Sequence, residues 1–144
     1  MAIVGVGTDI IEIERIKKAA GRASFVSKVF TEKEISLCRQ KPDFYAALAI
    51  RFAAKEAVVK ALGTGLRGCT WQDIEVLSSS TGQPFVLLYG GAKDIAAGRG
   101  ITSILVSMSH SRENAVAFCV AEGGEETDEA CNSGRNALAG PDSN

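Results

Sequence analysis

The sequence predicts an α+β domain in which a mostly antiparallel sheet packs against helices. Three observations lead to this prediction. The first half of the chain shows helical periodicity after one strand-like segment, the second half shows short strand-like segments, and the turn sequence TGQP joins two of these as in a hairpin. With 144 residues, 46% of them hydrophobic, the chain can form the core of a single domain.

The N-terminal segment is predicted to be a strand followed by a helix. Residues 2–8 (AIVGVGT) are short, branched and punctuated by glycine, which indicates a buried strand. Asp9 is expected to open a helix that runs to about residue 20, because Glu12 completes a capping-box pattern. The glycines also resemble the start of a dinucleotide-binding fingerprint, but Ile10 replaces the third glycine of GxGxxG, so we discard that interpretation.

Two more helices are predicted before the middle of the chain. Thr31 and Glu34 form a capping-box pattern ahead of a helix over about residues 32–40. Pro42 separates this helix from a long central helix over about residues 44–62, which is rich in alanine and has no internal proline.

The second half is predicted to hold four strands and one short helix. The strands DIEVLS and PFVLLY flank the TGQP turn, AKDIAAG forms the helix, and ITSILVSMS and NAVAFCVAE form the last two strands. Alternation along the third strand places His110 on the same face as Ile104, Val106 and Met108. From Gly123 onward the sequence is polar and acidic without periodicity, so we expect one domain over residues 1–122 and a disordered tail over 123–144.

Composition argues against several classes of protein. The formal net charge is −1 and the pI about 5.9, so no nucleic acid or membrane surface is expected as a partner. The four cysteines show no CxxC pair or histidine-linked spacing, which argues against zinc and favours reduced structural thiols. The N-terminus has no signal-peptide pattern and no apolar run has membrane-spanning length, which predicts a cytoplasmic protein.

The central helix carries charge on two opposite sides. Arg51 and Lys55 lie on one side, where they are expected to face solvent or a phosphate, and Glu56 and Lys60 lie on the other. Glu56 and Lys60 could form an ordinary i, i+4 ion pair, but small flanking alanines leave room for a ligand. Mg²⁺ is held in proteins by one or two carboxylates together with water and phosphate oxygens, and Asp9 with Glu56 would supply such a pair.

Three other positions each allow a structural and a functional interpretation. His110 is the only histidine, and a single histidine on an apolar face is more often structural than catalytic. Gly63 and Gly65 in the string KALGTG could bring backbone amides to a phosphate or an adenine, although a helix C-cap explains Gly63 equally well.

Four segments together resemble the holo-acyl-carrier-protein synthases, the small bacterial class of 4'-phosphopantetheinyl transferases. They are GVGTDIIEIERI at 5–16, RFAAKEAVVKALGTG at 51–65, the turn TGQP, and VSMSHS at 106–111. The resemblance covers about residues 2–122 and implies the phosphopantetheinyl transferase fold. It also implies Mg²⁺-dependent transfer of phosphopantetheine from coenzyme A to a serine of an apo acyl carrier protein, with release of 3',5'-ADP, and a homotrimer that binds coenzyme A between subunits.

The resemblance also implies roles for individual residues. Asp9 and Glu56 match the metal ligands, Lys60 the lysine at the diphosphate, His110 the histidine beside the coenzyme A phosphates, and Arg51 the arginine associated with the 3'-phosphate. The residue that accepts the serine proton stays open between Glu56, a metal-bound water and His110. We favour Glu56 or a water that it orients.

A basic stripe is expected on the first helix. Arg15, Lys18 and Arg22 follow i, i+3 and i+7 spacing, and the resemblance implies that they dock an acidic helix of the carrier protein. A solvated face is the alternative, with Glu14 paired to Lys18. Before the central helix the sequence offers only Arg39 and Lys41 where relatives often carry more basic residues. A noncatalytic coenzyme A or nucleotide-binding module with the same fold is the competing hypothesis.

Overall fold

The structure is a computed structural model that describes residues 1–124. Its elements follow in the order β1 (Ala2–Glu12), α1 (Ile13–Ala20), α2 (Ala23–Val29), α3 (Glu32–Arg39), α4 (Phe44–Leu62), the 3-10 turn η1 (Trp71–Asp73), β2 (Ile74–Ser78), β3 (Pro84–Leu88), α5 (Gly90–Gly98), β4 (Ile101–His110) and β5 (Asn114–Gly123). The sheet therefore extends one residue beyond the predicted domain end at 122. The rest of the predicted tail, beyond Gly124, lies outside the described residues.

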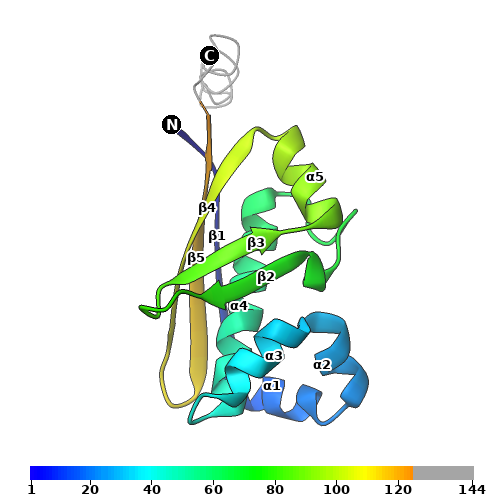
Figure 1. The fold of residues 1–144 in the computed structure, drawn as a ribbon, viewed down its shortest axis with the longest axis vertical. Helices are drawn as coiled ribbons and strands as arrows, with labels where there is room; N and C mark the ends of the chain where they lie inside the picture. The colour runs from blue at the N-terminus through cyan, green and yellow to red at the C-terminus, as the bar shows by residue number, and fades with distance from the viewer. Residues whose placement is uncertain (125–144) are drawn as a thin grey trace, which may run out of the picture.

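Two antiparallel sheets confirm the predicted α+β class. The larger sheet has the strand order β1-β5-β4, and β2 pairs with β3 as the predicted hairpin around the TGQP turn. Figure 1 shows the larger sheet nearly edge-on, with α4 beside it, helices α1 to α3 gathered at one end of the molecule and α5 at the other. Helix α4 packs directly on β1, β5 and β2, so it is the central element of the fold.

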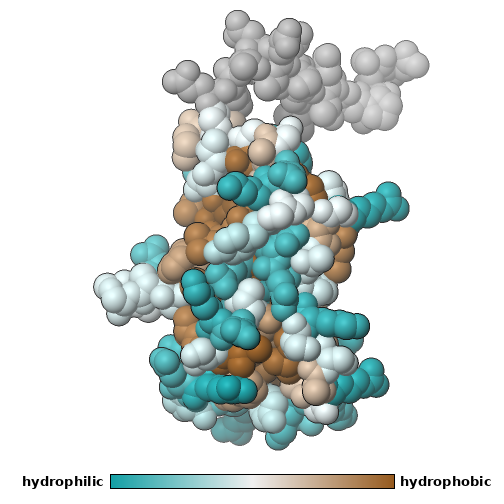
Figure 2. Space-filling view, turned by 45° about the vertical axis from the view of Figure 1, so that its right-hand side comes forward, coloured by the Kyte–Doolittle hydropathy of each residue, from teal (hydrophilic) through white to brown (hydrophobic). Residues whose placement is uncertain are grey.

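Helix α4 takes part in both hydrophobic clusters of the core. Its C-terminal half packs with the sheets and α5, and its N-terminal half packs with α1 to α3. Small side chains let other elements approach it closely, since Ala53, Ala54 and Ala57 are fully buried. The surface at the end of the molecule that holds α1 to α3 is both hydrophilic and hydrophobic. Figure 2 shows hydrophilic side chains there, with hydrophobic surface between them.

The first strand is longer than predicted, so the expected helix start at Asp9 is wrong. β1 continues to Glu12, and α1 begins only at Ile13. Asp9 pairs with Ala117 of β5, and the ladder continues through Ile10 and Ile11, whose β-branched side chains favour an extended backbone. Pairing along the whole edge of β5 outweighs the local capping-box pattern.

The basic stripe is also interrupted. Helix α1 ends at Ala20, and a separate short helix, α2, which the sequence analysis did not predict, begins at Ala23. Arg22 lies at the N-cap position of α2 with an extended backbone, so it does not continue the helical spacing of Arg15 and Lys18. Arg15 and Lys18 remain together on exposed positions of α1.

The glycines of GVG bring β1 into direct contact with α4. A Cβ atom added to Gly7 would lie 1.9 Å from the backbone oxygen of Ala57, and one added to Gly5 would lie 2.1 Å from that of Ala61. These contacts are with helix backbone, which cannot move aside as a side chain could. The glycine pair therefore serves strand-helix packing and fixes where Asp9, two residues after Gly7, meets the helix.

The expectation that Arg51 and Lys55 face solvent or phosphate is wrong for Lys55. Its side chain is fully buried, and its ammonium lies 2.8 Å from Glu34 Oε1 of α3. Burial lowers the pKa of Lys55, while the charge and hydrogen bond of Glu34 act in the opposite direction. Arg51 is 3% exposed and donates to Ala47 O at 3.3 Å. The side of α4 that appeared solvated in the sequence is therefore mostly interior.

The cysteines of the described region behave as the sequence predicted. Cys38, Cys69 and Cys119 are free thiols, and burial raises the pKa of each, for Cys119 to about 12. Cys131 lies outside the described residues. In residues 1–124 no helix is both long and apolar enough to cross a membrane.

Candidate functional site

Asp9, Glu56 and Lys60 meet where β1 crosses α4. Asp9 points to the α4 side of the sheet, because its partner Ala117 is buried on that side. Lys60 lies on α4 with its ammonium 3.3 Å from Asp9 Oδ1 and 2.8 Å from the backbone oxygen of Thr8. Glu56 precedes Lys60 by one helical turn, and the Asp9 carboxyl lies close enough to raise the pKa of Glu56. This geometry is consistent with the prediction from the sequence that the three side chains come together.

The two carboxyl groups of this site repel each other when both are charged. The pKa of Glu56 is raised to about 7, mainly by partial burial and also by the neighbouring Asp9 carboxyl. Lys60 and Arg15 lower it. Two neighbouring carboxylates repel each other, and a cation between them would stabilise the charged form of both.

The donor set at this site fits Mg²⁺. Asp9 Oδ2 is a buried oxygen without a hydrogen-bond partner, and it belongs to the carboxyl that faces Glu56. A buried unpaired carboxylate oxygen is costly, and a cation between the two carboxyls would remove that cost. Among the described residues, no group of three or more histidine, cysteine or acidic side chains is placed to hold a metal ion. Two carboxylates leave positions for water and phosphate oxygens, as Mg²⁺ prefers.

Arg51 and His110 line a different cavity, of about 390 Å³, together with Lys41 of the segment before α4. His110 lies at the end of β4, and its alternation with Ile104, Val106 and Met108 is as the sequence predicted. Arg51 Nε is buried without a hydrogen-bond partner, and Arg51 Nη2 lies 3.4 Å from Ser78 Oγ. The rest of the lining is apolar except for Asp43, so Lys41, Arg51 and His110, with the unpaired donor of Arg51, are the groups of this cavity that could contact an anion.

The ring of His110 has one nitrogen already engaged. Its Nδ1 lies 3.0 Å from the backbone oxygen of Ser111, which is only an acceptor. The proton of the neutral ring therefore belongs on Nδ1, and Nε2 is left free to accept a proton or, once protonated, to donate to a phosphate oxygen.

One chain does not bring all the predicted site residues into one pocket. Strand β5 lies between β1, which carries Asp9, and β4, which carries His110. The cavity of Arg51 and His110 is not lined by Asp9, Glu56 or Lys60. The candidate site therefore consists of a carboxylate half and a basic half on different sides of α4.

The two glycines proposed to contact a ligand differ in their surroundings. Gly63 adopts a left-handed C-cap conformation, and its N–H donates to Lys60 O at 3.1 Å and Val59 O at 3.2 Å, so this amide is used within the helix end. Gly65 has a φ of 61° and open space around it. Arg99, which the sequence analysis missed, donates to the backbone oxygens of Ala61 and Leu62 and so closes the C-terminus of α4.

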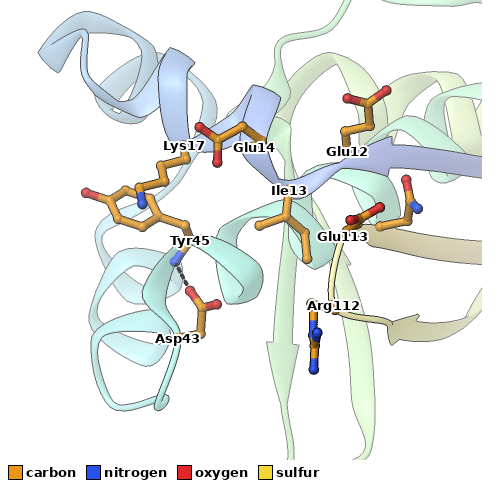
Figure 3. A pocket seen from close by; sticks show the side chains of 9 residues that line it. Glu12, Ile13, Glu14, Lys17, Asp43, Tyr45, Arg112 and Glu113 are labelled. Carbon is orange, nitrogen blue, oxygen red and sulfur yellow. Dashed lines mark hydrogen bonds between the residues drawn. The ribbon is translucent and has the colours of Figure 1, made fainter.

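Two basic side chains of α1 lie in different surroundings, Arg15 beside the carboxylate half and Lys17 at another cavity. The charge of Arg15 lowers the pKa of Glu56, which places Arg15 close enough to act on that carboxyl. Lys17, which was not singled out in the sequence, lies over the ring of Tyr45 at 5.6 Å from its centre, beside a cavity of about 500 Å³ (Figure 3). In the same view Asp43 accepts from the backbone N–H of Tyr45 and caps α4.

The face of the larger sheet turned away from α4 is hydrophobic and exposed. Residues on all three strands contribute to this outer face: Val6, Ile10, Leu105, Val116 and Phe118. Ile10 is 68% exposed and Phe118 47% exposed. Large apolar side chains gathered on three adjacent strands indicate an interaction surface.

Comparison with known proteins identifies the family. The ACPS family model, described as 4'-phosphopantetheinyl transferase superfamily, matches residues 5–119. The chain is 49% identical over 123 residues to a holo-[acyl-carrier-protein] synthase of Caldanaerobacter subterraneus subsp. tengcongensis, which covers 85% of this chain and 97% of the relative. The chain therefore belongs to the ACPS family of phosphopantetheinyl transferase enzymes.

Solved structures agree with this assignment and with the fold. The holo-[acyl-carrier-protein] synthase of Neisseria meningitidis superposes with a TM-score of 0.78 at 33% identity, over 84% of this chain and 99% of the other. A holo-(acyl-carrier-protein) synthase of Bacillus anthracis str. Ames, in complex with CoA (3',5'-ADP), superposes with a TM-score of 0.71 at 35% identity, over 85% of this chain and 98% of the other. The resemblance seen in the sequence is confirmed.

Proposed function

We propose that the chain transfers 4'-phosphopantetheine from coenzyme A to a serine hydroxyl of an apo acyl carrier protein, with Mg²⁺ bound, and releases 3',5'-ADP. The observation that carries this proposal is the carboxylate half of the site. Asp9 Oδ2 is buried without a partner, the Glu56 carboxyl faces it, and the Lys60 ammonium lies 3.3 Å from Asp9 Oδ1. The coenzyme A complex of the Bacillus anthracis relative supports coenzyme A as the substrate.

Asp9 and Glu56 would hold the metal ion, and Lys60 would contact the diphosphate. Bound Mg²⁺ would neutralise charge on the diphosphate oxygens and so favour departure of the nucleotide. The Lys60 side chain is 55% exposed, so its ammonium can leave Asp9 and reach a phosphate oxygen that arrives at the site. Its positive charge then stabilises the charge that develops on the leaving phosphate.

The transfer forms one bond and breaks one. The serine oxygen attacks the phosphorus that carries the pantetheine arm, the bond from that phosphorus to the oxygen of 3',5'-ADP breaks, and the serine proton leaves. Glu56, or a water that it orients, accepts this proton in our proposal. His110 is the alternative acceptor, because its Nε2 is free.

The basic half would hold the phosphates of the nucleotide. Arg51 has a buried Nε without a partner, and Lys41 and His110 line the same cavity. A dianionic phosphate would use the unpaired donor of Arg51 and the charge of Lys41. Just before α4 the sequence offers only Arg39 and Lys41, and of these two Lys41 lines the cavity.

We also propose that the active enzyme is a homotrimer with its sites between subunits. The carboxylate half and the basic half lie on different sides of α4, so one coenzyme A can use both only if a neighbouring subunit supplies one of them. The exposed outer face of the larger sheet offers the apolar surface that such an assembly would bury. The predicted partners are therefore coenzyme A, an apo carrier protein and two further copies of the chain.

The basic residues beside Glu56 are proposed to dock the carrier protein. Arg15→Glu is expected to raise the KM for the apo carrier protein by about tenfold, which corresponds to roughly 1.4 kcal/mol, and to leave the KM for coenzyme A nearly unchanged. Steady-state kinetics with each substrate varied in turn would measure both constants. Lys93→Glu makes the same charge change on α5, at the other end of the molecule, and serves as the control. An unchanged KM for the carrier protein in the Arg15 variant, or an equal rise in the control, would contradict this docking surface.

Intact-mass analysis of an apo acyl carrier protein tests the proposed function directly. The carrier protein is incubated with the enzyme and coenzyme A, with Mg²⁺ or with EDTA. A metal-dependent gain of one phosphopantetheine is the expected result. Binding of coenzyme A without any gain, across several carrier proteins, would favour the alternative of a noncatalytic coenzyme A or nucleotide-binding module.

A further inference from the structure

A buried ion pair involves the residue next to Glu56, which belongs to the carboxylate half of the site. Lys55 is the residue before Glu56 on α4, and its side chain and that of Glu34 are both fully buried. The Lys55 ammonium lies 2.8 Å from Glu34 Oε1, donates to Trp71 O at 3.0 Å and also to Ile74 O, and lies 5.8 Å from the centre of the Phe30 ring. These contacts together hold the Lys55 ammonium in one position.

Glu34 connects this lysine to other parts of the chain. Its Oε1 also accepts from the backbone N–H of Thr31 at 2.9 Å, and its Oε2 accepts from the backbone N–H of Val76 at 2.9 Å. The pair therefore joins the N-terminus of α3, the middle of α4, η1 and β2 at one point. The capping box predicted from the sequence is present, but its glutamate has a second, long-range role.

The opposite flank of α4 is fixed by the glycine contacts. Gly7 touches the backbone of Ala57, the residue after Glu56, and Gly5 touches that of Ala61. Glu56 thus lies between Lys55, which is held on one side, and Ala57, which is held on the other. Any rotation of α4 about its axis would break one of these contacts, so the direction of the Glu56 side chain depends on both.

Stability alone does not account for a charged pair at this position. Apolar side chains of similar volume often replace a buried ion pair with no loss of stability, because desolvation of both charges costs about as much as their attraction supplies. Directional hydrogen bonds, in contrast, specify one helix position among several that apolar packing would allow. The pair is therefore better explained by geometry than by stability.

We propose that Lys55 and Glu34 are positioning residues that hold Glu56 against Asp9, so that the two carboxylates bind the metal ion together. This inference rests on the proposed function, because it assumes that Asp9 and Glu56 are the metal ligands. Neither Lys55 nor Glu34 is accessible to substrate, so both act only through α4.

The test compares metal binding in variants that lack the pair. Lys55→Met alone leaves the Glu34 carboxylate buried without its cation, so it is expected to lower the melting temperature more than the double variant Lys55→Met/Glu34→Gln, in which no charge is left unpaired. The binding of Mn²⁺, a paramagnetic substitute for Mg²⁺, is followed by electron paramagnetic resonance with and without coenzyme A. The double variant is expected to bind Mn²⁺ about tenfold more weakly than the unmodified chain.

Val76→Ala is the matched control. Val76 is fully buried on β2, its backbone N–H still reaches Glu34, and removal of two methyl groups lowers stability without a change in the ion pair. Its Mn²⁺ affinity is expected to stay within about twofold of that of the unmodified chain. Unchanged affinity in the double variant, or an equal loss in the control, would overturn the positioning role.

Glu56→Gln separates this inference from the proposed function. If it loses Mn²⁺ binding while the double variant retains full affinity, the metal site is correct and the positioning role is wrong. If Glu56→Gln binds Mn²⁺ as well as the unmodified chain does, or if the unmodified chain binds none, the metal assignment and the positioning role are both overturned.

Discussion

A chain with Gly7→Ala is expected to lose about 3 kcal/mol of stability and most of its transferase activity. The added Cβ would lie 1.9 Å from Ala57 O, 2.9 Å from Ala57 C and 3.0 Å from Ala61 N, all of them backbone atoms of α4. Real Cβ contacts are not this short, so β1 must move away from the helix. Asp9 lies on β1 two residues later and would move with it, away from Glu56 and Lys60.

Urea or thermal denaturation followed by circular dichroism measures the loss of stability, and the carrier-protein mass assay measures the loss of activity. Gly98→Ala is the control, because the same added methyl group meets no atom within 4 Å at the end of α5. That control is expected to keep the stability and activity of the unmodified chain. A Gly7→Ala chain with unchanged stability and activity would show that β1 does not need this close approach.

The glycine contacts also show what the sequence could and could not predict. GVG could be rejected as a dinucleotide fingerprint from the chain alone, because Ile10 replaces the third glycine. The reason for the two glycines depends on the position of α4, about fifty residues later in the chain, which no local pattern contains. The same holds for Asp9. Its capping-box pattern is local, whereas the pairing with β5 that keeps it in a strand is not.

The charges of α4 illustrate a second limit. The sequence places Glu56 and Lys60 on one side of the helix and Lys55 on the other, and the structure agrees. The sequence alone does not show which side of α4 is buried. A lysine is rarely fully buried unless it is paired, so Lys55 was expected to lie on the surface. The partner of Lys55 is Glu34, whose local signal is a helix cap. A buried pair of this kind becomes recognisable only when both helices are placed.

The carboxylate half was therefore predictable from the sequence, and the division of the site was not. Asp9, Glu56 and Lys60 carry a pattern of residue types that suits Mg²⁺ and phosphate, and one chain brings them together. Arg51 and His110 belong to a cavity on another side of α4. Only the sheet order, with β5 between β1 and β4, shows that one chain separates the two halves.

A mixture of two inactive variants is expected to recover activity if the site is shared between subunits. Glu56→Gln keeps the shape of the side chain but removes its charge, so it is expected to fold and to lose activity by about a hundredfold. His110→Ala removes the basic side chain of the other half and is also expected to lose most activity. In a trimer that contains both chains, about one in three sites would combine an intact Glu56 with an intact neighbouring His110.

Co-expression with two different affinity tags, followed by purification on both, yields the mixed trimers, and native mass spectrometry confirms their composition. Activity near a third of that of the unmodified enzyme is the expected result. The control mixes Glu56→Gln with Lys60→Met, which alter the same half of the site, so no combination of these chains restores it. If the first mixture stays as inactive as its components, each chain builds its own site, and the subunit-sharing part of the proposal is wrong. Recovery in the first mixture and not in the second requires that one coenzyme A is held by the carboxylate half of one chain and the basic half of another.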